Sequence, residues 1–256
     1  MSHNPVLLKE VIKYLNPRPG DFVIDGTADG GGHAVEILKR ILPGGKLLGL
    51  DLDEELLAKA RERISAGSEL ILEYGNYADL PEILKRKKLP RADALLLDLG
   101  FSSEQLASSG RGFSFAKDEP LLMTFDRTRK PVKRIIGELG EKELAKIIFE
   151  FSGEKFAERI ARSLKETLKR GPVDTTAKLR EAIFAAVPKN YERGRIDPAT
   201  RTFQALRIFA NDELGNLRRA MSNLEKVVRP GGRIVAISFH SLEDKIIKNA
   251  FREMEK

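Results

Sequence analysis

Short apolar runs alternate with amphipathic stretches along the first hundred positions of the chain. Four of these runs have the length and composition of buried strands, at residues 22–25, 46–51, 69–74 and 92–98. The stretches between them space their apolar residues as one face of a helix does, at residues 34–41, 52–64 and 81–88. Strand and helix alternating at this interval predict right-handed βαβ units that build a parallel sheet.

This alternation is absent from residues 102–219, where no run resembles a buried strand. Residues 154–170 instead place Phe156, Ile160 and Leu164 four positions apart, with alanines and a leucine beside them. That spacing is typical of an amphipathic helix. The middle of the chain is therefore predicted to be helical.

The strand pattern returns near the C-terminus, after a Pro-Gly-Gly turn at 230–232, in a fifth apolar run that ends at Ser238. We therefore expect an α/β protein with a Rossmann-like sheet and an inserted all-helical domain. The sheet domain takes residues 1–101 and 201–256, and the insertion takes residues 102–200.

Charge adds a preference for a polyanionic partner. The chain has 45 Lys and Arg against 38 Asp and Glu, a net charge of +7. Residues 154–219 alone hold fifteen Lys and Arg against nine Asp and Glu, so the insertion could bind a phosphate backbone. Helices with solvated basic faces are the alternative. With no cysteine and no apolar run long enough for a membrane span, we expect a soluble cytoplasmic protein.

Three of the predicted strands end in an acid, namely Asp25, Asp51 and Asp98. In a doubly wound sheet the C-terminal ends of neighbouring strands meet at one crevice, so these carboxylates are expected to face a shared pocket. Asp51 stands about 20 residues past the glycine loop, where an acid often accepts the hydroxyls of a ribose. The alternative is that such acids cap the following helix, and for Asp53 that interpretation is preferred.

The glycine loop does not follow the Gly-x-Gly-x-x-Gly spacing of dinucleotide sites, because Ala28 stands at the third position counted from Gly26. This argues against NAD. A nucleoside ligand without phosphates fits better, and S-adenosylmethionine is the commonest of these. A plain flexible turn at residues 30–32 is the alternative.

Six motifs lie in a fixed order along the chain. They are HNPVLL (residues 3–8), DGTADGGGH (25–33), LLDLGFSSEQL (96–106), RGFSF (111–115), PATRTFQALR (198–207) and SFHSLED (238–244). Together they make the chain resemble the bacterial small-subunit (16S) ribosomal RNA cytosine-N4 methyltransferases, almost from end to end.

The resemblance implies a Rossmann-like class I methyltransferase sheet with a helical insertion for RNA recognition. It implies S-adenosylmethionine as cofactor and methylation of a cytidine in the decoding centre of the small (30S) subunit. The cofactor contacts carried over from the family fall on Gly31, Gly32, His33, Asp51, Tyr77, Asp98 and Gln105. Tyr77 offers a flat surface for adenine, with capping of the sheet edge as the alternative.

The predicted chemistry needs a hydrogen-bond acceptor on the target amine, because the lone pair of N4 is delocalised into the cytosine ring. Asp98, or the backbone carbonyls of Leu99 and Gly100, would supply it. We expect Asp98 and the loop that contains Ser102 to frame the amine, and Phe101 or Phe113 to stack on an extruded base.

Three further residues are candidates for target contacts. His240 follows the fifth strand and could touch the base or accept its proton, or simply bond to backbone at the strand end. Arg201 and Arg207 could bind RNA or, alternatively, anchor the insertion. A metal site made from His3, His33 and His240 lacks any short ligand pair and is not expected.

The chain also departs from the resembled family. Leu122 and Thr124 replace an acid and an arginine, Asp29 stands at a usual glycine, and Asp197 stands where a histidine often precedes Pro-Ala-Thr. The family generally continues beyond SFHSLED for some tens of residues, so closing antiparallel strands are expected to be missing. A non-catalytic ribosome-assembly factor and a small-molecule methyltransferase stay open as alternatives. The oligomeric state also stays open, with a dimer as one possibility.

Overall fold

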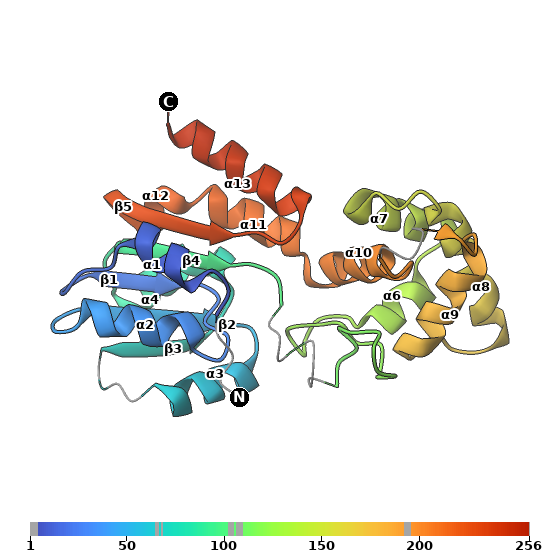
Figure 1. The fold of residues 1–256 in the computed structure, drawn as a ribbon, viewed down its shortest axis with the longest axis horizontal. Helices are drawn as coiled ribbons and strands as arrows, with labels where there is room; N and C mark the ends of the chain where they lie inside the picture. Colours follow the sequence, from blue (N-terminus) through green and yellow to red (C-terminus); the bar gives the residue numbers. More distant parts are fainter. Residues whose placement is uncertain are drawn as a thin grey trace. The chain divides into compact units, whose positions relative to one another are not determined.

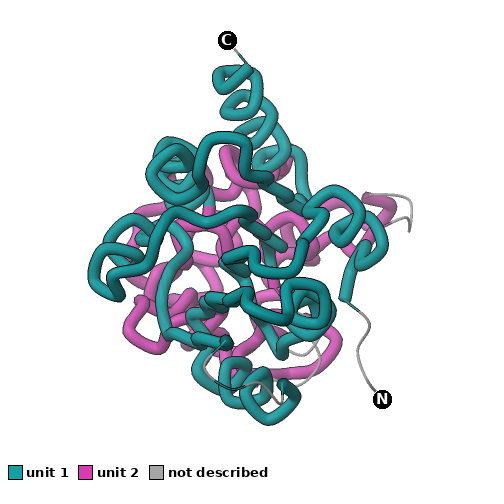
Figure 2. The backbone as a smooth tube through the Cα atoms, turned by 90° about the vertical axis from the view of Figure 1, so that its left-hand side faces the viewer, with its two compact units in different colours: residues 1–100, 214–256 teal, residues 101–213 magenta. Residues whose placement is uncertain are grey.

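A computed structural model of the chain describes residues 5–64, 67, 69–101, 105, 110–191 and 196–255. The chain divides into two compact units (Figure 2). We call residues 1–100 with 214–256 the sheet unit, and residues 101–213 the helical unit. The helical unit continues past residue 200 because α10 (Thr200–Asn211) buries Phe203 and Leu206 in its core.

The sheet unit contains five parallel strands in the order β3-β2-β1-β4-β5 (Figure 1). They are β1 (Phe22–Asp25), β2 (Lys46–Asp51), β3 (Leu70–Tyr74), β4 (Ala92–Asp98) and β5 (Val228–Ile237). The order in which the chain adds strands reverses at β1, because β2 and β3 lie on one side of it and β4 and β5 on the other. Ile24 of β1 lies between Leu48 of β2 and Leu95 of β4. Crevices at such a reversal are where open α/β sheets bind ligands. The prediction of a Rossmann-like parallel sheet is confirmed.

Alternation along the strands places a helical layer on each face of this sheet. One face is covered by α1 (Leu8–Leu15), α2 (Gly32–Ile41) and α3 (Glu54–Arg63). The other is covered by α4 (Leu80–Lys87), α11 (Glu213–Met221), α12 (Leu224–Val227) and α13 (Ser241–Met254). Val23 packs with the first set, whereas Phe22 and Ile24 pack with the second. Burial on both faces explains why the inner strands β1, β2 and β4 read as almost continuous apolar runs.

The helical unit is built around its own hydrophobic core. Its helices are α6 (Val132–Glu138), α7 (Glu141–Ser152), α8 (Ala157–Arg170), α9 (Thr176–Ala186) and α10. Ile160 and Leu164 of α8 are fully buried, as their four-residue spacing predicts. The described residues of this unit contain no strand, only an isolated bridge between Pro120 and Thr175.

The aspartate that precedes Pro-Ala-Thr has a structural task in the helical unit. Oδ1 of Asp197 accepts the backbone N–H of Ala199 at 2.8 Å, just before α10 begins. Its Oδ2 accepts two hydrogen bonds from the guanidinium of Arg180 on α9, at 2.8 and 3.2 Å. Asp197 therefore fastens the start of α10 to α9.

The altered segment at 119–126 is likewise part of the helical unit's framework. The Leu122 carbonyl accepts the backbone N–H of Val132 at 2.9 Å, where α6 begins, and Thr124 is buried. Met123 donates its backbone N–H to the Arg111 carbonyl at 2.7 Å. None of the helices that the structure describes is long and apolar enough to cross a membrane.

Candidate functional site

The glycine loop leads from the end of β1 to the start of α2 and is tied to both neighbouring strands. Gly26 donates its N–H to the Leu96 carbonyl of β4 at 2.9 Å, and Ala28 donates to the Leu50 carbonyl of β2 at 2.7 Å. Gly31 is the N-cap of α2 and has φ 81°, a conformation that favours glycine. These bonds therefore hold the loop at the C-terminal end of β1, where the strand order reverses.

Asp25 ends β1 in full burial. Its Oδ1 accepts the backbone N–H of Thr27 at 3.2 Å, and its Oδ2 has no hydrogen-bond partner within the described residues. Burial raises the pKa of Asp25 to about 6; His33 and the Thr27 N–H oppose the rise, and the charges of Asp98 and Asp29 add to it. Thr27 also accepts the backbone N–H of Asp98 through its hydroxyl at 2.7 Å. The ends of β1 and β4 are thus joined through Thr27.

Asp51 ends β2 and is held by two backbone donors. Its Oδ2 accepts the N–H of Asp29 at 2.8 Å, and its Oδ1 accepts the N–H of Asp53 at 2.9 Å. Burial raises the pKa of Asp51 to about 7 despite these bonds, and the nearby carboxylates of Asp29 and Asp53 add to the rise. Asp53 itself accepts the Glu55 N–H at 3.1 Å as the N-cap of α3, so its predicted capping role is confirmed.

The conformation of Asp29 accounts for its place in the glycine loop. Its φ is 47°, in the left-handed region that favours glycine and that aspartate tolerates better than most residues. Its backbone N–H is the donor that reaches Asp51. An aspartate can therefore adopt the backbone conformation that a glycine would have at this position. It also adds a carboxylate whose charge acts on Asp25 and Asp51.

His33 lies in the first turn of α2 and is 5% exposed. Its Nε2 is 3.4 Å from Oδ2 of Asp98 at the end of β4, and neither ring nitrogen makes a hydrogen bond within the described residues. Oδ1 of Asp98 also has no hydrogen-bond partner there. His33, Asp25 and Asp98 thus form a buried polar group whose bonding capacity is only partly used.

Tyr77 opens the short helix η1 (Tyr77–Asp79) that follows β3. The end of β3 is bonded to the end of β2, because Gly75 donates its N–H to the Asp51 carbonyl at 3.0 Å. A Cβ added to Gly26 would lie 3.1 Å from the Cβ of Tyr77, so Tyr77 borders the glycine loop. Its ring is half-buried and packs on the hydrophobic core, so it does cap part of the sheet.

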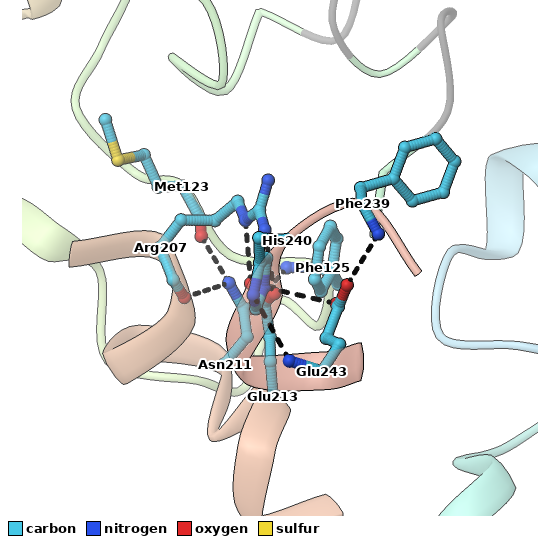
Figure 3. A network of polar contacts seen from close by, with 8 residues as sticks. All are labelled: Met123, Phe125, Arg207, Asn211, Glu213, Phe239, His240 and Glu243. Carbon is cyan, nitrogen blue, oxygen red and sulfur yellow. Dashed lines mark hydrogen bonds and ion pairs between the residues drawn. The ribbon is translucent and has the colours of Figure 1, made fainter. Parts of the chain in front are cut away.

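His240 forms the N-cap of α13 (Figure 3). Its Nδ1 accepts the backbone N–H of Glu243 at 3.4 Å, and its Nε2 lies 3.3 Å from Oε1 of Glu243. Glu243 in turn accepts the Phe239 N–H at 2.9 Å. These contacts fit the alternative that His240 bonds to backbone at the strand end. Its Nε2 makes no hydrogen bond within the described residues, and its catalytic role stays a prediction.

Arg207 lies within α10 of the helical unit, with its side chain only 9% exposed. Its guanidinium donates to both oxygens of Glu213, at 2.8 and 2.9 Å, and lies 4.6 Å from the ring centroid of Phe101. Asn211, one turn later, bonds the Arg207 and Met123 carbonyls and the Phe125 N–H (Figure 3). These contacts fit the alternative that Arg207 anchors the insertion, because its charge and donors are engaged inside the unit, and its RNA contact stays a prediction.

Arg201 has comparable internal partners. Its Nη1 donates to the Tyr191 hydroxyl at 2.9 Å and lies 3.9 Å from Oε2 of Glu154, which is fully buried. The Tyr191 hydroxyl also lies 2.8 Å from Oε1 of that carboxylate. The Arg201 side chain is 32% exposed and so keeps part of its surface, while its contacts with Tyr191 and Glu154 are those of an anchor.

Phe113 belongs to the core of the helical unit and is 7% exposed. Its ring stacks with Phe101 at 6.3 Å and with Phe125 at 5.2 Å between centroids. These contacts give Phe113 the position of a core residue, and the stacking of Phe101 or Phe113 on an extruded base stays a prediction. Gln105 is also buried in this unit, and Ser102 and His3 lie outside the described residues.

Comparison with known proteins places this geometry in a family. All 256 residues match the MraW methylase family. The ribosomal RNA small subunit methyltransferase H of Syntrophus aciditrophicus is 45% identical over 256 residues, which cover 99% of this chain and 81% of that protein. Proteins of the same name from Symbiobacterium thermophilum and Geobacter sulfurreducens are 44% and 45% identical, over 99% and 98% of this chain and 80% and 81% of theirs.

The chain belongs to the MraW methylase family. This membership confirms the resemblance seen in the motifs and gives the Rossmann-like sheet its class, that of a methyltransferase.

For a member of the MraW methylase family, the structure brings together one part of the predicted site. Asp51, Asp98 and His33 lie around the loop of Gly31 and Gly32, with Tyr77 at its border. Sequence reasoning missed Thr27, whose hydroxyl fixes the Asp98 backbone. The available signal was its position inside a matched motif between two strand-end acids.

Proposed function

We propose that this protein transfers a methyl group from S-adenosylmethionine to the exocyclic N4 of a cytidine in small-subunit ribosomal RNA. One observation carries the proposal, in a chain of the MraW methylase family. The aspartates that end β2 and β4 are hydrogen-bonded to the glycine loop, Asp51 through its side chain and Asp98 through its backbone N–H. The RNA class follows the names of relatives that are 42–45% identical over nearly the whole chain. The finer assignment, a cytidine of the decoding centre methylated in the cytoplasm, follows from the motif resemblance.

The residues present fit a nucleoside that carries a positive charge and no phosphates. Asp51 offers a carboxylate for ribose hydroxyls, the backbone at Gly31 allows close approach, and Tyr77 borders the loop with a flat ring. The buried oxygens Asp25 Oδ2 and Asp98 Oδ1 have no hydrogen-bond partner in the described residues, which suits donors on a ligand. Carboxylates gathered at this loop would repel the phosphates of a dinucleotide.

When bound, S-adenosylmethionine supplies a methyl group already activated by a sulfonium. The protein must hold the amine in line and accept its proton. In this proposal Asp98 Oδ2, which lies 3.4 Å from His33 Nε2, accepts a hydrogen bond from the N4–H and so localises the nitrogen lone pair. As the nitrogen–carbon bond forms and the sulfur–carbon bond breaks, the extra proton on N4 passes to this carboxylate. Thr27 and His33 hold Asp98 in place from its backbone and its side chain.

The helical unit is the proposed RNA-recognition part, on the strength of its thirteen Lys and Arg against nine Asp and Glu in residues 154–213. Since Arg201 and Arg207 have partners inside the unit, phosphate contacts would fall to other basic residues on its surface, such as Lys155, Lys169 and Arg170.

Methyl incorporation tests the proposal directly. The protein is incubated with labelled S-adenosylmethionine and, separately, with unmethylated small subunits, free 16S ribosomal RNA and cytidine. We expect label in the subunit or the RNA, and N4-methylcytidine after digestion to nucleosides. Label in cytidine alone would support a small-molecule methyltransferase, and tight subunit binding without any label would support a non-catalytic assembly factor.

A further inference from the structure

Four aspartates lie at the C-terminal edge of the sheet, three at the ends of strands and one in the glycine loop. Asp29 donates its N–H to Asp51, and Asp98 is bonded through its N–H to the Thr27 hydroxyl, two residues after Asp25. The charges of Asp29 and Asp98 act on Asp25, and that of Asp29 also acts on Asp51. We call Asp25, Asp29, Asp51 and Asp98 the acidic loop cluster.

Two members of this cluster, Asp25 and Asp51, receive little positive charge from the described residues. In the part of the chain that the structure describes, neither Asp25 nor Asp51 pairs with a lysine or arginine. His33 is the basic group that lies against Asp98 and acts on Asp25. Moreover, Asp25 is fully buried with one oxygen unbonded. Buried carboxylates without a cation are costly, so the cluster suits a ligand that brings a positive charge.

We propose that the acidic loop cluster discriminates the methyl donor from the demethylated product by charge, and that Asp29 is a specificity-determining residue in it. This inference rests on the proposed function. S-adenosylmethionine carries a sulfonium cation, whereas S-adenosylhomocysteine carries a neutral thioether at the same atom. Methyl transfer takes that positive charge from the sulfur, and the amine sheds its proton. The cluster therefore binds the cationic donor more tightly than the product, whose sulfur is neutral.

Asp29 is the member whose contribution can be isolated. Its backbone makes the structural bond to Asp51, and a substitution of its side chain leaves that N–H in place. Its φ of 47° is tolerated by asparagine and by glycine, so Asp29→Asn and Asp29→Gly both keep the backbone path. Each removes one negative charge. For two unit charges on the order of 10 Å apart in an effective dielectric of about 20 to 40, Coulomb's law gives a change in affinity of about fourfold to fifteenfold, and we expect an effect of this size.

Calorimetric titration with three ligands separates charge from shape. The ligands are S-adenosylmethionine, S-adenosylhomocysteine and sinefungin. In sinefungin a carbon that bears an amino group, protonated and cationic at neutral pH, replaces the sulfonium. We expect both Asp29 variants to bind the two cationic ligands about fourfold to fifteenfold more weakly, and to bind S-adenosylhomocysteine as the wild type does. Glu253→Gln removes the same charge from an exposed position near the end of α13 and should change none of the three affinities.

Equal weakening of all three ligands would overturn charge discrimination, because it would mean that the substitution disturbs the loop. Unchanged affinities in both variants would overturn it as well. If the wild type binds none of the three ligands, the proposed function itself fails. Binding by the wild type with selectivity that does not depend on Asp29 overturns only the present inference.

Discussion

The charged residues at the edge of the sheet unit and those inside the helical unit have opposite fates. Around the glycine loop, Asp25 and Asp98 each keep an oxygen that no hydrogen bond uses in the described residues. In the helical unit, Arg207 makes a two-bond pair with Glu213, and Arg201 contacts Tyr191 and Glu154. Polar side chains with unused hydrogen-bonding capacity are typical of a ligand site, whereas polar side chains that bond to one another stabilise the fold. Equally matched motifs can therefore hold quite different roles.

The largest effect is expected from Asp98→Asn, which removes the proposed acceptor and preserves size. Methyl transfer should fall about 10²-fold to 10⁴-fold, because an amide cannot take the N4 proton. Cofactor affinity should change far less. Single-turnover methylation of small subunits, together with calorimetric titration of S-adenosylmethionine, measures both quantities. Full methyl transfer at unchanged affinity would remove Asp98 from the mechanism.

Arg207→Ala tests the other side of the comparison. It leaves Glu213 buried without its partner, so the free energy of unfolding should drop by about 3–5 kcal/mol. Urea denaturation followed by circular dichroism measures the change. A variant as stable as the wild type that had lost RNA affinity would show that Arg207 is a recognition residue after all, and the contrast between the two units would fail.

Asp51→Asn should weaken S-adenosylmethionine about tenfold to hundredfold, because a hydrogen bond to a charged acceptor is lost at the ribose. The asparagine Oδ1 can still accept one backbone N–H, so the loop should remain folded. Calorimetry gives the affinity and a thermal melt checks the fold. An unchanged affinity in a folded variant would place the ribose elsewhere.

Cofactor binding should depend on pH through the same acids. The pKa is about 6 for Asp25 and about 7 for Asp51 in the ligand-free protein, and a cationic ligand favours their ionised forms. Affinity should therefore rise with pH, by about tenfold from pH 6 to pH 8 for one group near 7. Titrations across this range in wild type and Asp51→Asn measure it, and an equal slope in both would exclude Asp51 as the source.

Stability of the ligand-free protein should follow the opposite course. Both pKa values are raised from the ordinary 3.8, so the folded state holds these protons more tightly than the unfolded chain. This contribution is fully present below pH 4 and is lost as the pH rises through about 6 and 7. Urea midpoints at pH 5 and pH 8, with and without S-adenosylmethionine, should show the loss and its reversal by the ligand.

The smallest effect is expected from Asp197→Ala in the helical unit. It removes the acceptor for the Ala199 N–H and a half-exposed partner of Arg180, so it should cost about 1 kcal/mol of stability. Cofactor affinity, a property of the other unit, should not change. A loss of cofactor affinity without a loss of stability would contradict the purely structural task assigned to Asp197.

Much of the sheet unit follows from the sequence alone, because strands buried on both faces must be continuous apolar runs and the helices between them must be amphipathic. The acids at strand ends were likewise readable, since parallel strands bring their C-terminal ends to one edge. The motif order identified the family, and comparison of the whole chain confirmed it. These features depend on local pattern and on chain direction, which a sequence contains.

Partners of individual side chains depended on the tertiary structure. In the sequence, Arg207 and Asp98 are alike, because both are charged residues in matched motifs. In the structure, Arg207 is enclosed by Glu213 and Phe101, whereas Asp98 keeps an oxygen without a hydrogen bond in the described residues. Asp29 could be understood only from its backbone angle and its bond to Asp51. Burial, pairing and φ arise when distant segments pack together, and no local pattern encodes them. The sequence determined where chemistry could gather, and packing decided which side chains remained available for it.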